Sequence, residues 1–332
     1  MDFLNVLFPV SGVETNILLP PLVAFVVSFF TSMGGVSGAF LLLPLQMSIL
    51  KYTSPSVSAT NFVFNIVAIP SGVYRYIKEG RMAWPLTWVV IAGTLPGVFI
   101  GYYLRVLYLP DPKAFKLFVG CVLLYMGVRL LYEIIPPIPP LIKGGEGGLR
   151  KNQMKALEEK FKQRSAQLKE SQKSKLAAGI PPEAVVKTIS FSLKKIEYEF
   201  WGETFSFSTV AMFVLAFIVG IIGGTYGIGG GAIIAPFCIA VFHLPVYTVA
   251  GAALMGTFLT SIAGVTFYSI MPAREGLATS PDWMLGFLFG IGGFVGMYLG
   301  ARFQKFVPQR FIKLLLGILI IFVALQYIYQ YF

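Results

Sequence analysis

The stretch GGTYGIGGGAIIAP, residues 223–236, decides the fold, because it sets six glycines in fourteen residues between two apolar segments. Glycine inside a helix costs about 0.5–1 kcal/mol relative to alanine. A helix is therefore expected to break here, and the surrounding sequence indicates what the break is for.

The composition is typical of a membrane protein. Of 332 residues, 56% are hydrophobic and 12% are charged, whereas soluble domains carry about 25% charged residues. Apolar runs at 84–104, 114–131 and 311–328 approach the roughly 20 residues that a helix needs to cross a bilayer. We therefore predict an all-α polytopic membrane protein.

The positive charge and the cysteines have simple interpretations. The net charge of +11 fits the Lys and Arg that accumulate in cytoplasmic loops of membrane proteins, and no aromatic–basic motif predicts nucleic-acid binding. Cys121 and Cys238 lie in apolar segments, where buried small side chains are expected rather than a disulfide or metal ligands. No cofactor and no metal site is predicted.

The chain divides at a polar insertion. Residues 136–205 separate a first membrane repeat, 1–135, from a second, 206–332. The insertion begins with proline- and glycine-rich sequence, continues with one weakly apolar helical stripe at 151–175, and alternates apolar and polar residues from 185 onward. The stripe predicts either a regulatory helix or a solvated linker helix, and the alternation predicts a β-hairpin.

The two membrane halves repeat each other. Aligning Gly35 with Gly227, an offset of 192, places GVSGAFLLLP (35–44) on GIGGGAIIAP (227–236), proline on proline. After a three-residue insertion the order continues, with Trp88 on Trp283, Gly97 on Gly292 and Gly101 on Gly296. Chance similarity between apolar helices does not keep glycine, proline and tryptophan in register, so an internal repeat is predicted.

Charge indicates that the repeats are inverted. Residues 136–203 carry 13 Lys or Arg and 8 Asp or Glu, whereas the N-terminal flank carries only Asp2 and Glu14. The positive-inside rule then places the insertion in the cytoplasm and the N-terminus outside. The first half must cross an odd number of times, so residues 16–50 are expected to form two short membrane segments broken at the glycines. We predict about ten segments, as two inverted five-segment repeats in the cell membrane, with both termini outside.

Paired breaks at matching positions of two repeats are typical of a transporter binding site. Helices expected at 39–49 and 232–242 begin after the glycines, so their first N–H groups are free and carry the positive end of the helix dipole. Two such ends facing each other would hold a small anion. The alternative is close packing of small residues between helices.

Polar side chains near the breaks support this site. Asn61 and Asn65 share a helical face at i, i+4, as do Thr257 and Ser261, although hydrogen bonding between helices is the alternative for each. The predicted substrate-binding residues are Gly34, Gly35, Ser37, Gly38, Asn61, Asn65, Gly227, Gly229, Gly230, Gly231, Thr257 and Ser261, with Gln46 as a weaker candidate.

The pair GGVSGAFLLLP and GIGGGAIIAP resembles the hallmark of the sulfite exporter TauE/SafE family of membrane permeases. The second copy is close to that family's glycine pattern, and the first has Ser37 and Ala39 where glycines are commonest. The resemblance covers both membrane halves and not the central insertion. It implies transport of sulfite, sulfoacetate, another organosulfonate or a related small anion across the cytoplasmic membrane.

Three classes of function are weighed. A secondary transporter for a small anion, driven by an H⁺ or Na⁺ gradient, fits the breaks, and no Walker-type phosphate loop is present. His243, the only histidine, is either a proton-coupling group or an interfacial polar residue. An enzyme is not expected, because no buried acidic pair or nucleophile with a base is present, and no catalytic residue is predicted. A receptor or scaffold acting through the insertion is the alternative, which deletion of 144–178 would test, and a homodimer is left open.

Overall fold

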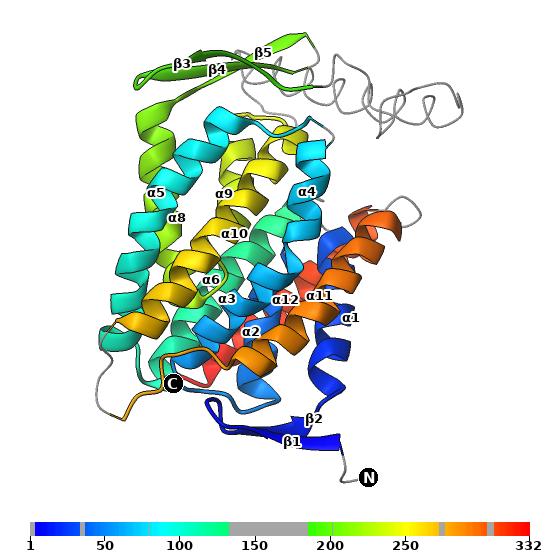
Figure 1. The fold of residues 1–332 in the computed structure, drawn as a ribbon, viewed down its shortest axis with the longest axis vertical. Helices are drawn as coiled ribbons and strands as arrows, with labels where there is room; N and C mark the ends of the chain where they lie inside the picture. Colours follow the sequence, from blue (N-terminus) through cyan, green and yellow to red (C-terminus); the bar gives the residue numbers. More distant parts are fainter. Residues whose placement is uncertain are drawn as a thin grey trace.

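A computed structural model describes residues 4–33, 37–78, 80–132, 185–200, 202–271, 276–303 and 309–332. Within them the chain forms a bundle of helices with a small β-sheet at each end (Figure 1). The helices of the first half are α1 (Leu19–Met33), α2 (Ala39–Ser48), α3 (Ser56–Ala68), α4 (Pro70–Lys78), α5 (Trp84–Tyr103), the π-helical turn η2 (Leu104–Tyr108) and α6 (Pro112–Tyr132). Those of the second half are α8 (Thr209–Tyr226), α9 (Gly231–Ala240), α10 (Val246–Ile270), α11 (Trp283–Phe303) and α12 (Gln309–Tyr329).

The helices have the length and composition of membrane spans. Six in the described ranges are long and apolar enough to cross a bilayer: Ser56–Lys78, Trp84–Tyr108, Pro112–Tyr132, Thr209–Tyr226, Thr248–Ile270 and Trp283–Gly300. Shorter apolar helices cover Leu19–Ser32, Ala39–Ser48 and Leu314–Tyr329. The chain is therefore a mostly helical, polytopic membrane protein.

Both predicted helix breaks are present. Residues 16–50 form the separate helices α1 and α2 rather than one long span, and the glycine-rich stretch at 223–236 separates α8 from α9. The helices that follow the breaks, α2 and α9, are only ten residues long, and each contains one proline, Pro44 and Pro236. A ten-residue helix spans about 15 Å, half of the bilayer core, so each can end inside the protein.

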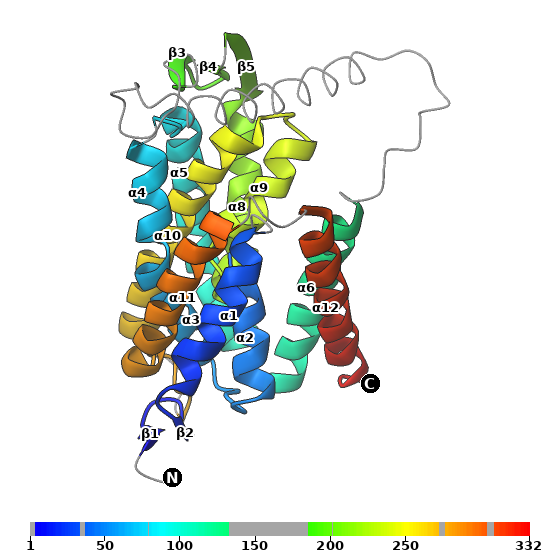
Figure 2. The ribbon, with the colours of Figure 1, turned by 90° about the vertical axis from the view of Figure 1, so that its right-hand side faces the viewer.

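Helices of one half pack on helices of the other. α1 packs on α11 and α5 on α8, while α11 packs on α3 and α10 on α5. α3 also contacts α10, and α6 lies beside α12 along one flank of the bundle (Figure 2). Glycines allow the closest of these contacts: a Cβ at Gly97 would lie 2.4 Å from the Phe217 carbonyl oxygen, and one at Gly292 would lie 1.9 Å from that of Pro21.

The strands lie at opposite ends of the bundle, and the all-helical expectation did not include all of them. A hairpin of β1 (Asn5–Phe8) and β2 (Val13–Asn16) lies at the end of the bundle where the C-terminus is also found (Figures 1 and 2). It is attached to α11, because the Ser11 hydroxyl donates to the Asp282 carboxylate over 2.8 Å and Asp282 also accepts from the Leu285 N–H.

The opposite end carries a three-stranded antiparallel sheet of β3 (Lys187–Phe191), β4 (Lys195–Phe200) and β5 (Glu203–Ser208). The predicted β-hairpin is thus two strands of a larger sheet. Alternate residues of β4, namely Ile196, Tyr198 and Phe200, are buried on one face, as period-two patterning requires. β5 continues past the predicted boundary at 205 and leads directly into α8. The helix expected at 151–175 lies outside the described residues.

Candidate functional site

The two glycine breaks meet in the interior, and Asn61 joins them. Its side-chain amide donates to the Ala39 carbonyl of α2 over 3.0 Å and to the Gly227 carbonyl of the second break over 2.9 Å. One turn along α3, the Asn65 amide donates to the Ile228 carbonyl over 3.1 Å. Both asparagines are fully buried. The α1–α2 and α8–α9 pairs therefore approach each other across α3.

Side chains of other helices complete the hydrogen bonding of the α8 C-terminus. The last carbonyls of a helix have no partner within it, and in a membrane they must be satisfied by protein. The Ser58 hydroxyl donates to the Thr225 carbonyl over 3.2 Å, and the Tyr268 hydroxyl donates to the Gly224 carbonyl over 3.1 Å. Helix α8 can therefore end deep inside the molecule.

The second break needs glycine for both conformation and space. Gly227 and Gly229 have φ values of 86° and 76°, in the left-handed region that L side chains rarely adopt. A Cβ at Gly227 would also lie 2.5 Å from the Ser58 carbonyl oxygen. At this position the backbone of the break rests directly on the backbone of α3.

The start of α9 is packed as closely. A Cβ at Gly231 would lie 1.7 Å from the Ala253 carbonyl oxygen and 2.3 Å from the Thr257 hydroxyl oxygen, both on α10. A Cβ at Gly230 would lie 2.5 Å from the Thr94 methyl carbon on α5. The first turn of α9 is thus enclosed between α5 and α10.

The first break is described only from Ser37 onward, and Gly34 and Gly35 lie outside the described residues. The Ser37 hydroxyl accepts from the Ala39 N–H over 3.4 Å and lies 3.5 Å from the Asn65 amide oxygen. Gly38 lies against α1, since a Cβ there would be 2.9 Å from the Ser28 hydroxyl oxygen. Ser37 and Gly38 therefore belong to the same junction as Asn61 and Asn65.

Two helix N-termini are buried at this junction. Neither α2 nor α9 has a side-chain hydrogen bond from its N-cap residue, Gly38 and Gly230 respectively. The first N–H groups of a helix point along its axis and carry about half a unit of positive charge. Each of these two N-termini therefore favours negative charge at its own end.

Three buried polar atoms near the junction have no hydrogen-bond partner within the part of the chain that the structure describes. They are the Ser28 and Ser261 hydroxyl oxygens and the Gln46 amide oxygen. Ser28 adjoins Gly38, and Ser261 is one turn along α10 from Thr257. Buried polar groups of this kind call for an explanation, and a polar ligand is one.

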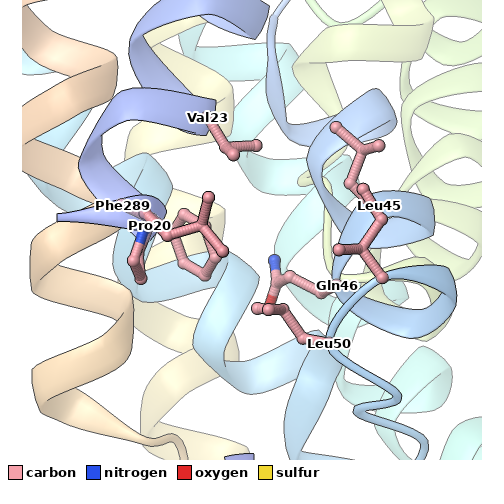
Figure 3. Close-up of a pocket in the computed structure, with 8 residues that line it drawn as sticks. Pro20, Val23, Leu45, Gln46, Leu50 and Phe289 are labelled. Carbon is pink, nitrogen blue, oxygen red and sulfur yellow. The ribbon is translucent and has the colours of Figure 1, made fainter. Parts of the chain in front are cut away.

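A small cavity lies beside the junction. It is partly open to its surroundings and is lined by Leu19, Pro20, Val23, Leu45, Gln46, Ile49, Leu50 and Phe289. Figure 3 shows the Gln46 amide among these apolar side chains. The Gln46 amide nitrogen donates to the Asn61 amide oxygen over 3.4 Å. Gln46 therefore connects this cavity to the asparagine that joins the two breaks.

The proline of α2 explains one further contact. Pro44 has no N–H, so the Phe40 carbonyl four residues earlier lacks its usual helical partner. The Tyr226 hydroxyl, at the end of α8, donates to that carbonyl over 2.6 Å. The proline of one half is thus compensated by a tyrosine of the other.

We expect Tyr226→Phe to lower the free energy of unfolding by about 1–2 kcal/mol, because it leaves a buried carbonyl without a donor. In a Pro44→Ala background the loss should be smaller, because the alanine supplies the helical N–H that proline lacks. The measurement is a double-mutant cycle of thermal or denaturant unfolding on the purified protein. Full additivity of the two changes would show that the tyrosine does not serve the proline-freed carbonyl.

The structure brings most of the predicted site residues together. Ser37, Gly38, Asn61, Asn65, Gly227, Gly229, Gly230, Gly231 and Thr257 lie at the junction of the breaks. The asparagines bond to break carbonyls, which is the interhelical alternative, and the Thr257 hydroxyl donates to Ala253 of its own helix over 2.9 Å. His243 is exposed in the α9–α10 turn, with a φ of 52°.

Sequence reasoning missed several residues that complete the junction. Ser58 lies three residues before Asn61 on the same face of α3, and this spacing was a usable signal. Tyr226, Tyr268 and Thr94 gave none, because single polar residues in apolar helices do not reveal their partners. Among the described residues, no three His, Cys, Asp or Glu side chains are grouped as metal ligands would be.

These features define a class: a polytopic helical membrane protein whose two broken helices meet at a buried polar junction. The chain matches the sulfite exporter TauE/SafE family over residues 21–327. It belongs to that family, in agreement with the resemblance of its two glycine motifs.

Relatives of known sequence carry consistent names. The chain is similar to two probable membrane transporter proteins of Bacillus subtilis, YunE (26% identical over 127 residues, 38% of this chain and 44% of the relative) and YdhB (33% over 95 residues, 29% and 36%). It is also similar to probable membrane transporter protein MJ0441 of Methanocaldococcus jannaschii (30% over 116 residues, 33% and 41%). The chain therefore spans less than half the length of each relative. No solved structure matches it.

Proposed function

We propose that this protein is a secondary transporter that moves a small anion across the cell membrane, binding it at the junction of the two broken helices. The observation that carries the proposal is the pair of hydrogen bonds from Asn61 to Ala39 and to Gly227. Because one side chain bonds to both breaks, the N-termini of α2 and α9 adjoin one polar region. Family membership and the names of the relatives support transport.

We further propose that the two halves are inverted five-segment repeats. In this arrangement α1, α2, α3–α4, α5 and α6 correspond to α8, α9, α10, α11 and α12. If each helix is replaced by its counterpart in the other half, the α1–α11 contact becomes α8–α5, and the α3–α11 contact becomes α10–α5. All four of these helix contacts are present in the structure. α12 binds α2 through the Tyr327 hydroxyl on the Pro44 carbonyl, and α6 binds α9 through Arg129 on the Pro236 carbonyl.

The junction suggests how the anion is held and released. Helix N-termini attract an oxyanion without contributing a full charge, each with about 0.3–2 kcal/mol. Neutral donors of this kind bind weakly enough that the anion can leave on the opposite side. The α1–α2 and α8–α9 pairs approach the junction from opposite ends of the bundle (Figure 1). Alternating access would expose the junction past one pair and then past the other.

For orientation, we propose that the β3–β5 sheet is cytoplasmic and that both termini are outside. The sheet and the β1–β2 hairpin lie at opposite ends (Figure 2), which supports an odd number of crossings per half. Lys78, Arg81 and Lys195 lie toward the sheet end, in agreement with the positive-inside rule. The division into repeats at 1–135 and 206–332 around the 136–205 insertion is part of the same proposal.

Sulfite or an organosulfonate is the proposed substrate, from the family description. The proposed driving force is an H⁺ or Na⁺ gradient, and no catalytic step is proposed. Uptake into proteoliposomes against imposed pH and sodium gradients separates these cases. Stimulation by one gradient identifies the coupling ion, and indifference to both identifies a uniporter. Cross-linking of the purified protein would test the homodimer.

We expect sulfite or a related anion to raise the melting temperature of the purified protein, because ligands that bind only the native state stabilise it. Gly230→Leu should abolish this shift, since Gly230 is the N-cap of α9 and adjoins Thr94. Sulfite, thiosulfate, sulfoacetate, taurine and short carboxylates form the screen, with chloride at equal ionic strength as control. A Gly230→Leu protein that binds and transports normally would leave the breaks a structural role only.

A further inference from the structure

Arg105 is a buried cation near the end of the α5 span that lies away from the β3–β5 sheet. It is fully buried, with 0% of its surface exposed, and lies in the π-helical turn η2. Its Nη1 donates to the Leu109 carbonyl, and its guanidinium carbon lies 3.7 Å from the centre of the Phe115 ring. Nε and Nη2 are buried and have no hydrogen-bond partner among the described residues.

The position of Arg105 places it next to the second glycine break. Gly93, Gly97 and Gly101 precede it at intervals of four residues, and this stripe of α5 faces α8. A Cβ at each of these glycines would lie 2.4–2.7 Å from successive α8 carbonyl oxygens, those of Phe213, Phe217 and Ile221. The next oxygen in that series belongs to Thr225, where α8 ends, and η2 itself contacts α8.

Helix packing does not account for an arginine at this position. With the offset of 195 that aligns Gly97 with Gly292, Arg105 corresponds to Gly300 on α11. A Cβ at Gly300 would lie 2.3 Å from the Phe29 carbonyl oxygen of α1. At this position the α1–α11 pair thus has a glycine in close contact, and the α5–α8 pair has an arginine.

The charge of Arg105 has no counter-charge in the described part of the chain. Its sequence neighbours on η2 are uncharged. Tyr102, three residues earlier, packs edge-on against Tyr268, whose hydroxyl donates to the Gly224 carbonyl at the break. A buried guanidinium without a counter-charge is costly in protein and more so in a membrane. The free Nε and Nη2 are adjacent donors, the edge that binds an oxyanion through two parallel hydrogen bonds.

We propose that Arg105 forms an anion subsite beside the second glycine break, on the side of the β1–β2 hairpin, with Nε and Nη2 as the donors. This inference rests on the proposed function, because the ligand is the transported oxyanion. The bound anion supplies the missing counter-charge. Arg105 then contributes one full positive charge to anion binding, whereas the helix N-termini contribute partial charges only.

The test compares wild type, Arg105→Met and Arg105→Lys, purified as the full chain, by melting temperature across a sulfite titration against chloride at equal ionic strength. We expect Arg105→Met to lose the sulfite-induced shift, with affinity weakened about tenfold or more, the effect of removing a charge-assisted hydrogen-bonding partner. Arg105→Lys keeps the charge but not the paired donors, so it should bind with intermediate affinity. Arg81→Met is the matched control, because Arg81 is also buried and its guanidinium carbon lies 4.6 Å from the Tyr76 ring centre.

The outcomes separate the subsite from the transporter proposal. If Arg105→Met, or Arg105→Lys should the methionine variant not fold, binds sulfite as tightly as wild type, the subsite is overturned and the junction remains. A lower melting temperature without sulfite combined with an unchanged sulfite shift would assign Arg105 only the structural role of capping the Leu109 carbonyl. If the wild-type protein shows no shift with sulfite, the proposed function itself fails for that anion.

Discussion

Gly231→Ala is expected to prevent the close contact between α9 and α10 and to lower the free energy of unfolding by about 3 kcal/mol, the upper end of the range for overpacking. The added Cβ would lie 1.7 Å from the Ala253 carbonyl oxygen and 2.3 Å from the Thr257 hydroxyl oxygen. Neither atom can yield as a flexible side chain can, because one is backbone and the other bonds to Ala253 itself over 2.9 Å. The measurement is the melting temperature and the monodisperse yield of the purified protein.

Gly72→Ala is the matched control. Gly72 is also helical, in α4, and a Cβ there would meet only the Leu254 Cδ1 atom at 3.2 Å, the tip of a movable side chain. It should therefore change stability by about 0.5 kcal/mol or less, and better helix propensity favours the alanine. If the two variants behaved equally, α9 would not pack on α10 as closely as described, and α10 would not enclose the first turn of α9.

Features carried by local sequence were predictable. Glycine clusters at 34–38 and 227–231 indicated breaks, because glycine is the poorest helix former after proline. The helices after them, α2 and α9, begin at Ala39 and Gly231, at or next to the predicted positions. Gly97 and Gly292, which the sequence alignment of the halves places on each other, each pack closely on a helix of the opposite half.

Features that depend on distant partners were not predictable. The β1–β2 hairpin is held by the contact between Ser11 and Asp282, which are 271 positions apart, and its two four-residue strands carry little pattern of their own. β5 continues the alternation of β4 across Gly202 and pairs Phe205 with Tyr198. Only its pairing with β4 distinguishes β5 from the start of α8, because the apolar content of β5 is compatible with a strand and with a helix.

The candidate site likewise has features that local sequence predicts and features that depend on distant partners. Spacing placed Asn61 and Asn65 on one helical face, but it could not reveal whether their amides point at a ligand or at backbone. In the structure they bond to carbonyls at the breaks. A break that frees donors also frees acceptors, since the helix that ends there loses partners for its last carbonyls. The asparagines serve carbonyls at the two breaks, beside the first turns of α2 and α9.

Asn61→Leu is expected to cost about 1–3 kcal/mol of stability and to abolish transport, because it leaves the buried Gly227 carbonyl without its donor and removes the bond that ties the Ala39 carbonyl of α2 to α3. Leucine has the same branched outline and is no smaller than asparagine, so the loss does not report a cavity. Asn61→Asp keeps the shape of the side chain but removes its hydrogen-bond donor. The carboxylate cannot donate to either carbonyl, and it also repels an anion. Both variants should therefore fail to bind sulfite, as measured by thermal shift and by uptake into proteoliposomes.

Thr266→Val on α10 is the control for exchanging a polar for an apolar side chain in this bundle. The Thr266 hydroxyl is exposed and donates to the Ile262 carbonyl of its own helix over 2.9 Å, a carbonyl that keeps its helical N–H when the hydroxyl is removed. This variant should behave as wild type. If Asn61→Leu were equally silent, the breaks would be held together without the asparagine, and α2 and α9 would need another reason to share one junction. Loss of sulfite binding in Asn61→Asp with stability retained would instead show that the anion lies within reach of that side chain.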